Sequence, residues 1–297
     1  MIWNAIPNDV IAWFRNAFAE ANRKVSEMLQ NAPNIRETSL DDAFVMALVP
    51  RSAPTRLGSG ALVRMHIHNI GGLRRLHHWE VADIGIVVFV SRANKIIAQK
   101  LALLQSKRLY PHNNSVDDED PGGFLYGLNA MLLIDRSRVS MALARRFDFQ
   151  SDCVYGSIKA HSQQVNTIES FSRQWRHPIG YLLYNPPKMP VSISYPLSKV
   201  QVRRRPPSAG TRVVPAPTVH SLLSQLPKGS APTYGQIKRH AGGEYWRVEF
   251  WAADLLLTCK AGLEFDAADS DMVLSVITRR SGPIGAAIAV HIELPAE

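Results

Sequence analysis

The first part of the chain carries hydrophobic residues at the spacing of amphipathic helices. Over residues 8–29 they recur at intervals of three and four, which predicts a helix whose buried face comprises Val10, Trp13, Phe14, Ala17, Phe18, Ala21 and Val25. A second helix is predicted over residues 35–48, where one face carries Leu40, Phe44, Val45 and Leu48. Both patterns are typical of helices that dock one apolar face on a protein core.

Strand patterns follow these two helices. Apolar residues alternate with polar ones at the period of a half-buried strand, namely at Val63, Met65 and Ile67. The runs 84–90 and 98–106 are almost continuously apolar and flank the turn-like residues 91–95. This arrangement predicts a hairpin whose two strands are largely buried.

Further along the chain, helices are predicted over residues 124–146 and 157–174, followed by a short apolar strand at 179–185. The order is therefore helix, strand, hairpin, helix and strand. This order predicts an α/β fold with a mixed central sheet that helices flank.

The composition changes at residues 200–217, which are rich in Pro and Arg. We predict a linker or extended loop there, between a core of residues 1–199 and a C-terminal α+β extension or small domain of residues 218–297. This last part is predicted to contain a helix near 220–226 and strands around 245–257, 272–278 and 286–294. These elements would form a small second domain or edge elements of the main sheet.

Charge and composition narrow the classes of partner. Lys and Arg number 34 against 25 Asp and Glu, a net charge of +9 that favours polyanions such as nucleic acid or acidic membrane. The N-terminus lacks signal-peptide features and no apolar run is long enough to span a bilayer, so we expect a cytoplasmic protein without a membrane partner. Cys153 and Cys259 show neither CxxC nor Cys/His spacing, which predicts no disulfide framework and no structural zinc module.

The predicted hairpin brings three polar side chains to one edge of the sheet. Asp83 precedes the first strand, whereas Gln105 and Lys107 end the second, and antiparallel pairing joins these ends. Side chains alternate along a strand, so Gln105 and Lys107 are expected on one side and Ser106 on the other. Oxygen atoms of Asp83, Gln105 and the helical Glu37 suit Mg²⁺ or Mn²⁺, and Lys107 could orient or deprotonate a bound water or neutralise phosphate charge.

Each of these residues also has a purely structural interpretation. Asp83 can flank a strand, and Lys107 with Arg108 can form a solvated basic edge. Glu37 fits a helix-capping box with Asn34, and Asp41 is an alternative helix carboxylate. Four histidines lack a recognisable zinc spacing and are expected to line a polar face near nucleic acid, namely His66, His68, His77 and His78.

Asp83, a hairpin and then Gln105-Ser106-Lys107 resemble the catalytic core of the PD-(D/E)XK, or restriction-endonuclease-like, nuclease superfamily. The variant with Gln resembles Mrr-like nucleases, and the resemblance covers residues 34–185. It implies a restriction-endonuclease-like core. Two positions depart from the family pattern, because Ala82 stands where the family has proline and the neutral Gln105 leaves the site with one anionic ligand fewer.

The resemblance also implies roles for individual residues. Asp83 and Gln105 would be metal ligands, Glu37 the helix carboxylate that assists the metal, and Lys107 the catalytic lysine, with Mg²⁺ or Mn²⁺ as cofactor. Nucleic-acid contacts are expected from Arg74, Arg75, Arg108, Lys159 and Gln164, of which the last two would lie on the helix after the hairpin.

The function that the resemblance implies is metal-dependent hydrolysis of phosphodiester bonds, in DNA more than in RNA, within prokaryotic restriction or anti-phage defence. Cutting both strands predicts a homodimer. The chain lacks a Walker A loop, so any ATP-driven step would need a regulatory or ATPase partner protein. The alternative is a catalytically degraded nuclease-fold protein that binds nucleic acid or scaffolds a complex.

Overall fold

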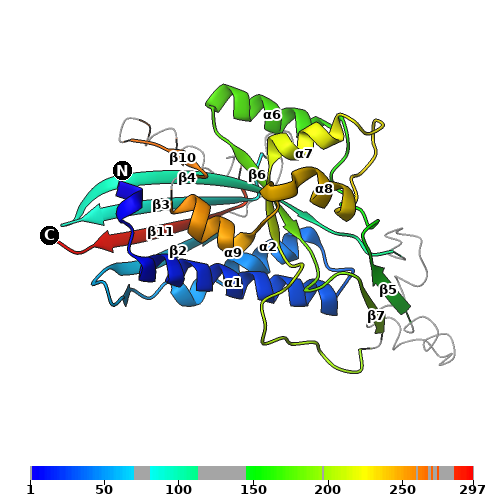
Figure 1. The fold of residues 1–297 in the computed structure, drawn as a ribbon, viewed down its shortest axis with the longest axis horizontal. Coiled ribbons are helices and arrows are strands. Elements are labelled where there is room, and N and C mark those ends of the chain that lie inside the picture. Colours follow the sequence, from blue (N-terminus) through cyan, green and yellow to red (C-terminus); the bar gives the residue numbers. More distant parts are fainter. Residues whose placement is uncertain are drawn as a thin grey trace.

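Helices cover both faces of one large mixed sheet (Figure 1). The structure is a computed structural model that describes residues 2–69, 81–112, 145–195, 197–258, 260–266, 269, 273 and 284–296. Within these residues the sheet has nine strands in the order β1-β2-β11-β3-β4-β6-β8-β9, and β10 pairs with β4 off this path. The mixed α/β architecture expected from the order of elements is therefore confirmed.

The two N-terminal helices form as the hydrophobic spacing predicts. Helix α1 (Asn8–Asn31) buries every apolar residue that the pattern assigns to its inner face. Helix α2 (Glu37–Met46) buries Leu40, Phe44 and Val45 and packs against α1. Short 3-10 turns at Ile2–Ala5 and Val49–Arg51 flank this pair.

The predicted hairpin forms the centre of the sheet. Strands β3 (Ile84–Arg92) and β4 (Lys95–Arg108) are antiparallel, with Ile84 opposite Leu104. Strand β2 (Leu62–Asn69) follows the predicted alternation, and the short β1 (Thr55–Arg56) pairs with its start. The register of the hairpin brings the start of β3 beside the end of β4, where the predicted site residues lie.

The crossover after the hairpin completes this end of the sheet. Helix α6 (Gln163–Trp175) leads into β6 (Ile179–Tyr184), which pairs in parallel with the end of β4. Strands β5 (Arg145–Phe149) and β7 (Val191–Tyr195) form a separate two-stranded sheet, which extends from the body beyond this end (Figure 1).

The C-terminal third adds to the same sheet. Strand β8 (Arg212–Pro215) extends it beyond β6, so the end of the predicted linker at 200–217 is part of the sheet. The elements that follow include α7 (Ala216–Leu223), α8 (Tyr234–Ala241), a 3-10 turn (Gly242–Glu244), β9 (Trp246–Arg247) and β10 (Leu263–Glu264). The last strand, β11 (Ala286–Leu294), is antiparallel to β2 and parallel to β3. It is therefore an interior strand, and neither an edge element nor part of a separate domain as the sequence suggested.

The strand predicted over residues 245–257 is wrong apart from β9. Helix α9 (Val248–Phe250) continues into a π-helical turn at Trp251–Leu256. Val248, Trp251, Ala252 and Leu256 are buried, and their spacing is helical, so packing against α1 favours a helix over a strand.

Several predictions concern residues outside the described ranges. They are most of the helix at 124–146, whose last two residues begin β5 instead, most of the strand at 272–278, and the side chains of Arg74, Arg75, His77 and His78.

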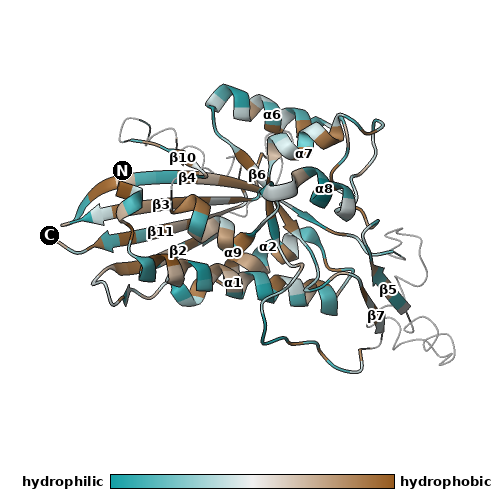
Figure 2. Cartoon of the chain, viewed as in Figure 1, coloured by the Kyte–Doolittle hydropathy of each residue, from teal (hydrophilic) through white to brown (hydrophobic). Residues whose placement is uncertain are grey.

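The distribution of hydrophobic residues agrees with this arrangement. Figure 2 shows them along β3, β4 and β11, whereas α6 and β5 are largely hydrophilic. None of the helices that the structure describes combines the length and the apolar character that crossing a lipid bilayer requires.

We expect His177, just before β6, to make the stability of the fold depend on pH. The residue is 2% exposed, and its Nδ1 lies 2.9 Å from the carbonyl oxygen of Pro178. Burial lowers the pKa of His177 to about 4. The unfolded chain therefore takes up the proton at higher pH than the folded protein, and stability is lost as the pH falls from about 6.5 towards 4.

We expect this loss to reach about 3 kcal/mol and to be smaller in His177→Phe, which has no group to protonate. Urea unfolding of both proteins between pH 7 and pH 4 measures the difference. Parallel loss of stability in the two proteins would show that His177 is not responsible.

Candidate acidic site at the end of the central hairpin

The structure brings together the four residues predicted to form the site. Asp83 directly precedes β3, Gln105 and Lys107 lie near the end of β4, and Glu37 is the first residue of α2. The amide nitrogen of Gln105 donates to Asp83 Oδ2, and Lys107 Nζ lies 3.1 Å from Glu37 Oε1. The hairpin of β3 and β4 and the N-terminus of α2 thus position the four side chains.

Ser106 also belongs to this site, although strand alternation placed it on the opposite side. Its backbone nitrogen and its Oγ donate to Asp83 Oδ2 at 2.8 and 2.9 Å. Asp83 lies just outside the regular β3–β4 pairing, so its carboxylate extends past the strand end and is reached from both sides of β4. One carboxylate oxygen therefore accepts three hydrogen bonds from Gln105 and Ser106.

Glu37 is held towards Lys107 and does not cap its helix. Its Oε2 accepts hydrogen bonds from the Arg108 backbone nitrogen at 3.0 Å and from Ser157 Oγ at 2.9 Å. Helix α2 has Arg36 at its N-cap, so the capping box with Asn34 does not form. The side chain of Lys107 is only 4% exposed, which makes its contact with Glu37 a buried ion pair.

A third carboxylate, Asp41, lies in the same cluster. Tyr184 at the end of β6 donates its hydroxyl hydrogen to Asp41 Oδ1 at 2.7 Å, and Asp41 is 8% exposed. Asp41 follows Glu37 by one helical turn, so the sequence could offer it only as an alternative to Glu37. In the structure both carboxylates belong to the cluster, and they have different hydrogen-bond partners.

Burial and mutual repulsion determine the ionisation of this cluster. Burial, reinforced by the charge of Asp83, raises the pKa of Asp41 well above its usual value. Burial also raises the pKa of Asp83, although the charge of Lys107 opposes this effect. Burial alone would lower the pKa of Lys107, but the charges of Glu37 and Asp83 raise it, so Lys107 is a cation. Asp41 and Asp83 therefore keep their protons to higher pH than usual, and a bound cation would favour release of these protons by stabilising the carboxylates.

The residues predicted to contact nucleic acid differ in their exposure to solvent. Arg108 is 2% exposed, its guanidinium donates to the carbonyl oxygens of Pro33 and Ile35, and burial lowers its pKa to about 10. It is therefore a structural residue and is not available to a phosphate. Lys159 is exposed but lies in the loop before α6, and the partly buried Gln164 is the second residue of that helix.

Gln105 provides the test of whether a metal ion suits this site. The side chain is 2% exposed, and its Oε1 is buried without a hydrogen-bond partner. Rotation of the amide would turn this oxygen towards the Asp83 carboxylate and make the pair an oxygen ligand set for a hard cation. Among the described residues the oxygens of Glu37, Asp41 and Asp83 do not all lie within 4.8 Å of one another. Asp83 and Gln105 are therefore the two residues of the cluster whose oxygens could contact one ion together.

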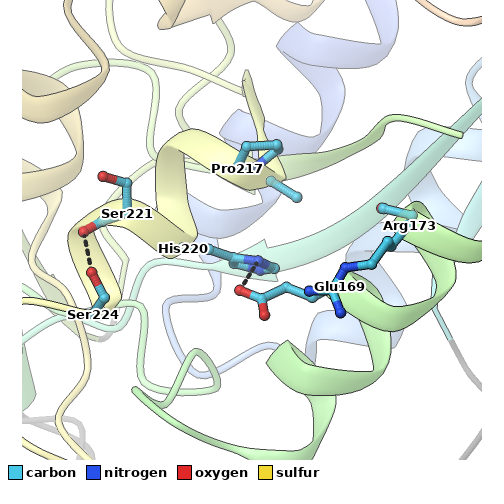
Figure 3. Close-up of a pocket in the computed structure, with 8 residues that line it drawn as sticks. Glu169, Arg173, Pro217, His220, Ser221 and Ser224 are labelled. Atoms are coloured by element: carbon cyan, nitrogen blue, oxygen red, sulfur yellow. Dashed lines mark hydrogen bonds and ion pairs between the residues drawn. The ribbon is translucent and has the colours of Figure 1, made fainter. Parts of the chain in front are cut away.

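A separate cavity of about 560 Å³ lies between α6 and α7. Figure 3 shows Glu169 and Arg173 of α6 on one side and His220 of α7 facing them. Glu169 Oε1 lies 3.1 Å from His220 Nδ1, and His220 Nε2 lies 3.0 Å from the buried Tyr181 hydroxyl. Tyr181 pairs with Gln105 in the sheet register, so these contacts extend from the cavity to the strand beside the acidic cluster.

Comparison of the chain with protein-family models, with curated proteins and with solved structures found no match.

Proposed function

We propose that this protein is a metal-dependent nuclease that hydrolyses phosphodiester bonds, most readily those of DNA. One observation carries the proposal: Asp83, Gln105, Lys107 and Glu37 converge at one sheet end, where Gln105 Oε1 has no partner. A buried lysine beside carboxylate and amide oxygens suits a cation and a phosphate together.

The order of elements supports a restriction-endonuclease-like core. Helix α2, strands β2, β3 and β4, helix α6 and strand β6 occur in this order, with only short elements and β5 between them in the described ranges, and β6 pairs in parallel with β4. The departure from this arrangement is β11, which separates β2 from β3. It inserts on the side away from β4 and leaves the hairpin that carries Asp83, Gln105 and Lys107 intact.

Each residue of the cluster has a distinct task in this proposal. Asp83 and Gln105 would hold Mg²⁺ or Mn²⁺, and a bound ion supplies a water molecule of lowered pKa and polarises a phosphoryl oxygen. Lys107 is a cation with a raised pKa, so it stabilises negative charge on the phosphate and does not act as the general base. Glu37 fixes the position of Lys107 through the 3.1 Å ion pair.

Nucleic acid is the substrate class that fits the rest of the chain. The net charge of +9 favours a polyanion, and DNA binding is expected to weaken strongly with salt. Exposed basic residues in the described ranges include Lys159, Arg173, Arg204, Arg205 and Arg239.

The experiment that tests the proposal uses the full chain with plasmid DNA, single-stranded DNA and RNA, each with Mg²⁺, Mn²⁺ or EDTA. Cleavage with either cation and none with EDTA is the expected result. A gel-shift assay on the same samples separates binding from cutting. Nucleic acid that is bound equally with cation or EDTA, and never cut, would overturn the proposal in favour of a nucleic-acid-binding protein with a degraded site.

Gln105→Glu should tighten binding of Mn²⁺ by about 10-fold, because it adds the anionic ligand that this site lacks. The same change is expected to lower the melting temperature in EDTA, since it places another buried carboxylate beside Asp83. Isothermal titration with Mn²⁺ and thermal melting in EDTA measure the two effects.

Gln225→Glu is the matched control, because it makes the same charge change at an exposed position on the turn after α7. It should alter neither quantity. Equal cation affinity in the two variants would remove Gln105 from the cation site.

A further inference from the structure

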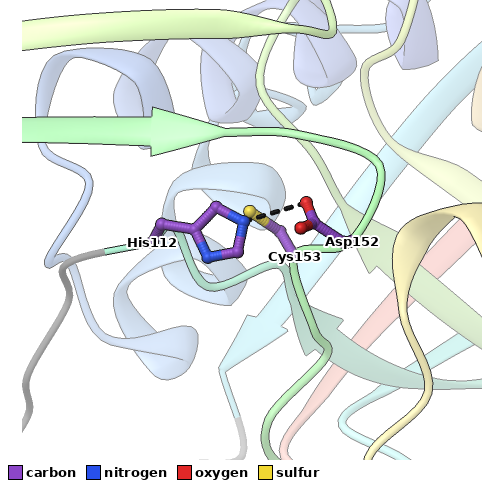
Figure 4. A group of neighbouring side chains, drawn as sticks. All are labelled: His112, Asp152 and Cys153. Carbon is purple, nitrogen blue, oxygen red and sulfur yellow. Dashed lines mark hydrogen bonds and ion pairs between the residues drawn. The ribbon is translucent and has the colours of Figure 1, made fainter.

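Three side chains that suit a softer metal ion meet outside the acidic cluster. His112 lies beyond the end of β4, and Asp152 and Cys153 lie in the turn after β5 (Figure 4). One ligand atom from each of the three lies within 4.8 Å of the other two, and His112 Nε2 is 2.9 Å from Asp152 Oδ1. In the part of the chain that the structure describes, this is the only such trio of His, Cys, Asp and Glu residues.

Backbone hydrogen bonds hold the two segments of this trio together. The His112 backbone nitrogen donates to the Asp148 carbonyl oxygen at 2.8 Å, and the Tyr110 backbone nitrogen donates to the Val154 carbonyl oxygen at 2.9 Å. Cys153 is fixed in addition by Tyr234, whose backbone nitrogen donates to its carbonyl oxygen at 2.8 Å. The ligand atoms are therefore positioned by the fold and not by the side chains alone.

The sulfur lies deeper in the fold than the other two ligand atoms. The Gln150 backbone nitrogen donates to Cys153 Sγ at 3.2 Å, which favours a thiolate, whereas burial raises the pKa of the thiol, so the proton is lost when a metal ion binds. Cys153 is 2% exposed, whereas the side chains of His112 and Asp152 are 43% and 68% exposed. The sulfur thus lies at the base of the site, and the imidazole and the carboxylate lie at its open side, where an ion can enter.

We propose that His112, Asp152 and Cys153 bind one Zn²⁺ ion, with water as the fourth ligand. Imidazole nitrogen, thiolate sulfur and carboxylate oxygen are the three donor types that zinc accepts in tetrahedral sites, whereas Mg²⁺ prefers oxygen donors alone. On binding, the Cys153 S–H bond breaks, its proton passes to solvent and a sulfur–zinc bond forms without any change of oxidation state. The Sγ hydrogen bond to the Asp148 carbonyl oxygen is given up in this step.

The position of this site suggests what the ion does. His112 precedes residues 113–144 in the sequence, and Asp152 and Cys153 follow them. A zinc ion would join the chain before this segment to the chain after it. Its first ligand in the sequence, His112, lies five residues beyond Lys107. The inference is independent of the proposed nuclease activity, because it concerns other residues and another class of metal.

The test titrates the full-length, metal-free protein with Co²⁺ and then with Zn²⁺ in excess Mg²⁺. A near-ultraviolet thiolate-to-cobalt charge-transfer band that Zn²⁺ abolishes, at one ion per chain, is the expected result. Cys153→Ser should remove the band and weaken Zn²⁺ binding by more than about 100-fold, as measured by competition with a chromogenic chelator.

Cys259→Ser is the matched control, since it removes the other cysteine and should leave the band unchanged. Thermal melting in EDTA shows whether Cys153→Ser folds like the wild type, and His112→Gln provides a second variant that keeps the sulfur. A band that survives Cys153→Ser, or Zn²⁺ affinity that neither variant changes, would mean an adventitious ion only and would overturn the proposal. Because cleavage is not measured, these outcomes leave the nuclease proposal unaffected.

Discussion

Asp83→Asn is expected to lower cation-dependent cleavage by more than about 100-fold and to raise the melting temperature of the cation-free protein. The amide keeps the size of the carboxyl group and can accept the hydrogen bonds from Ser106, but it has no charge to hold a cation. The folded protein retains the Asp83 proton to higher pH than the unfolded chain, because the pKa of Asp83 is raised. Ionising Asp83 at neutral pH therefore costs stability, which the uncharged amide restores.

The measurements are initial cleavage rates in Mg²⁺ and calorimetric melting in EDTA and in Mg²⁺. Wild-type protein should melt at a higher temperature in Mg²⁺ than in EDTA, and Asp83→Asn should not. Asp42→Asn is the control, because it makes the same charge change at an exposed position on α2. Wild-type cleavage by Asp83→Asn would show that another site cuts nucleic acid.

The local part of this arrangement could be predicted from sequence. The register of β3 and β4 follows from a short hairpin with two apolar runs, so Asp83 was expected beside Gln105 and Lys107. The helix that carries Glu37 follows from its hydrophobic spacing. Ser106 was left out of the predicted site because alternation places it on the other side of β4 from Gln105. The Asp83 carboxylate lies just before β3, where donors from both sides of β4 reach it.

Residues whose partners are distant in sequence could not be placed in the same way. Strand β11 pairs with β2 and β3, and no local pattern indicates such a pairing. Arg108 was expected on the surface because it is charged, but the carbonyl oxygens of Pro33 and Ile35 pair with its guanidinium in the interior. The approach of His112 to Cys153 has the same origin, since no ligand spacing in the sequence joins them.

Lys107→Met is expected to destabilise the cation-free protein by about 3 to 5 kcal/mol and to abolish cleavage. Lys107 forms an ion pair with Glu37 and lies close enough to Asp83 for its charge to raise the pKa of the lysine, and its own side chain is buried. Methionine fills a similar volume but leaves these carboxylates without a counter-charge. Urea unfolding in EDTA at neutral pH measures the loss.

The double variant Glu37→Gln with Lys107→Met separates the ion pair from packing. Removal of both charges should restore most of the lost stability, because the partner that Lys107 neutralises is then neutral as well. The double variant should still not cleave nucleic acid. A folded site without Lys107 lacks the cation that stabilises negative charge on the phosphate. The Lys107→Met change can be measured in the wild-type protein and in the Glu37→Gln variant. If it lowered the free energy of unfolding equally in both, the 3.1 Å contact would contribute nothing to stability, and packing alone would hold Lys107.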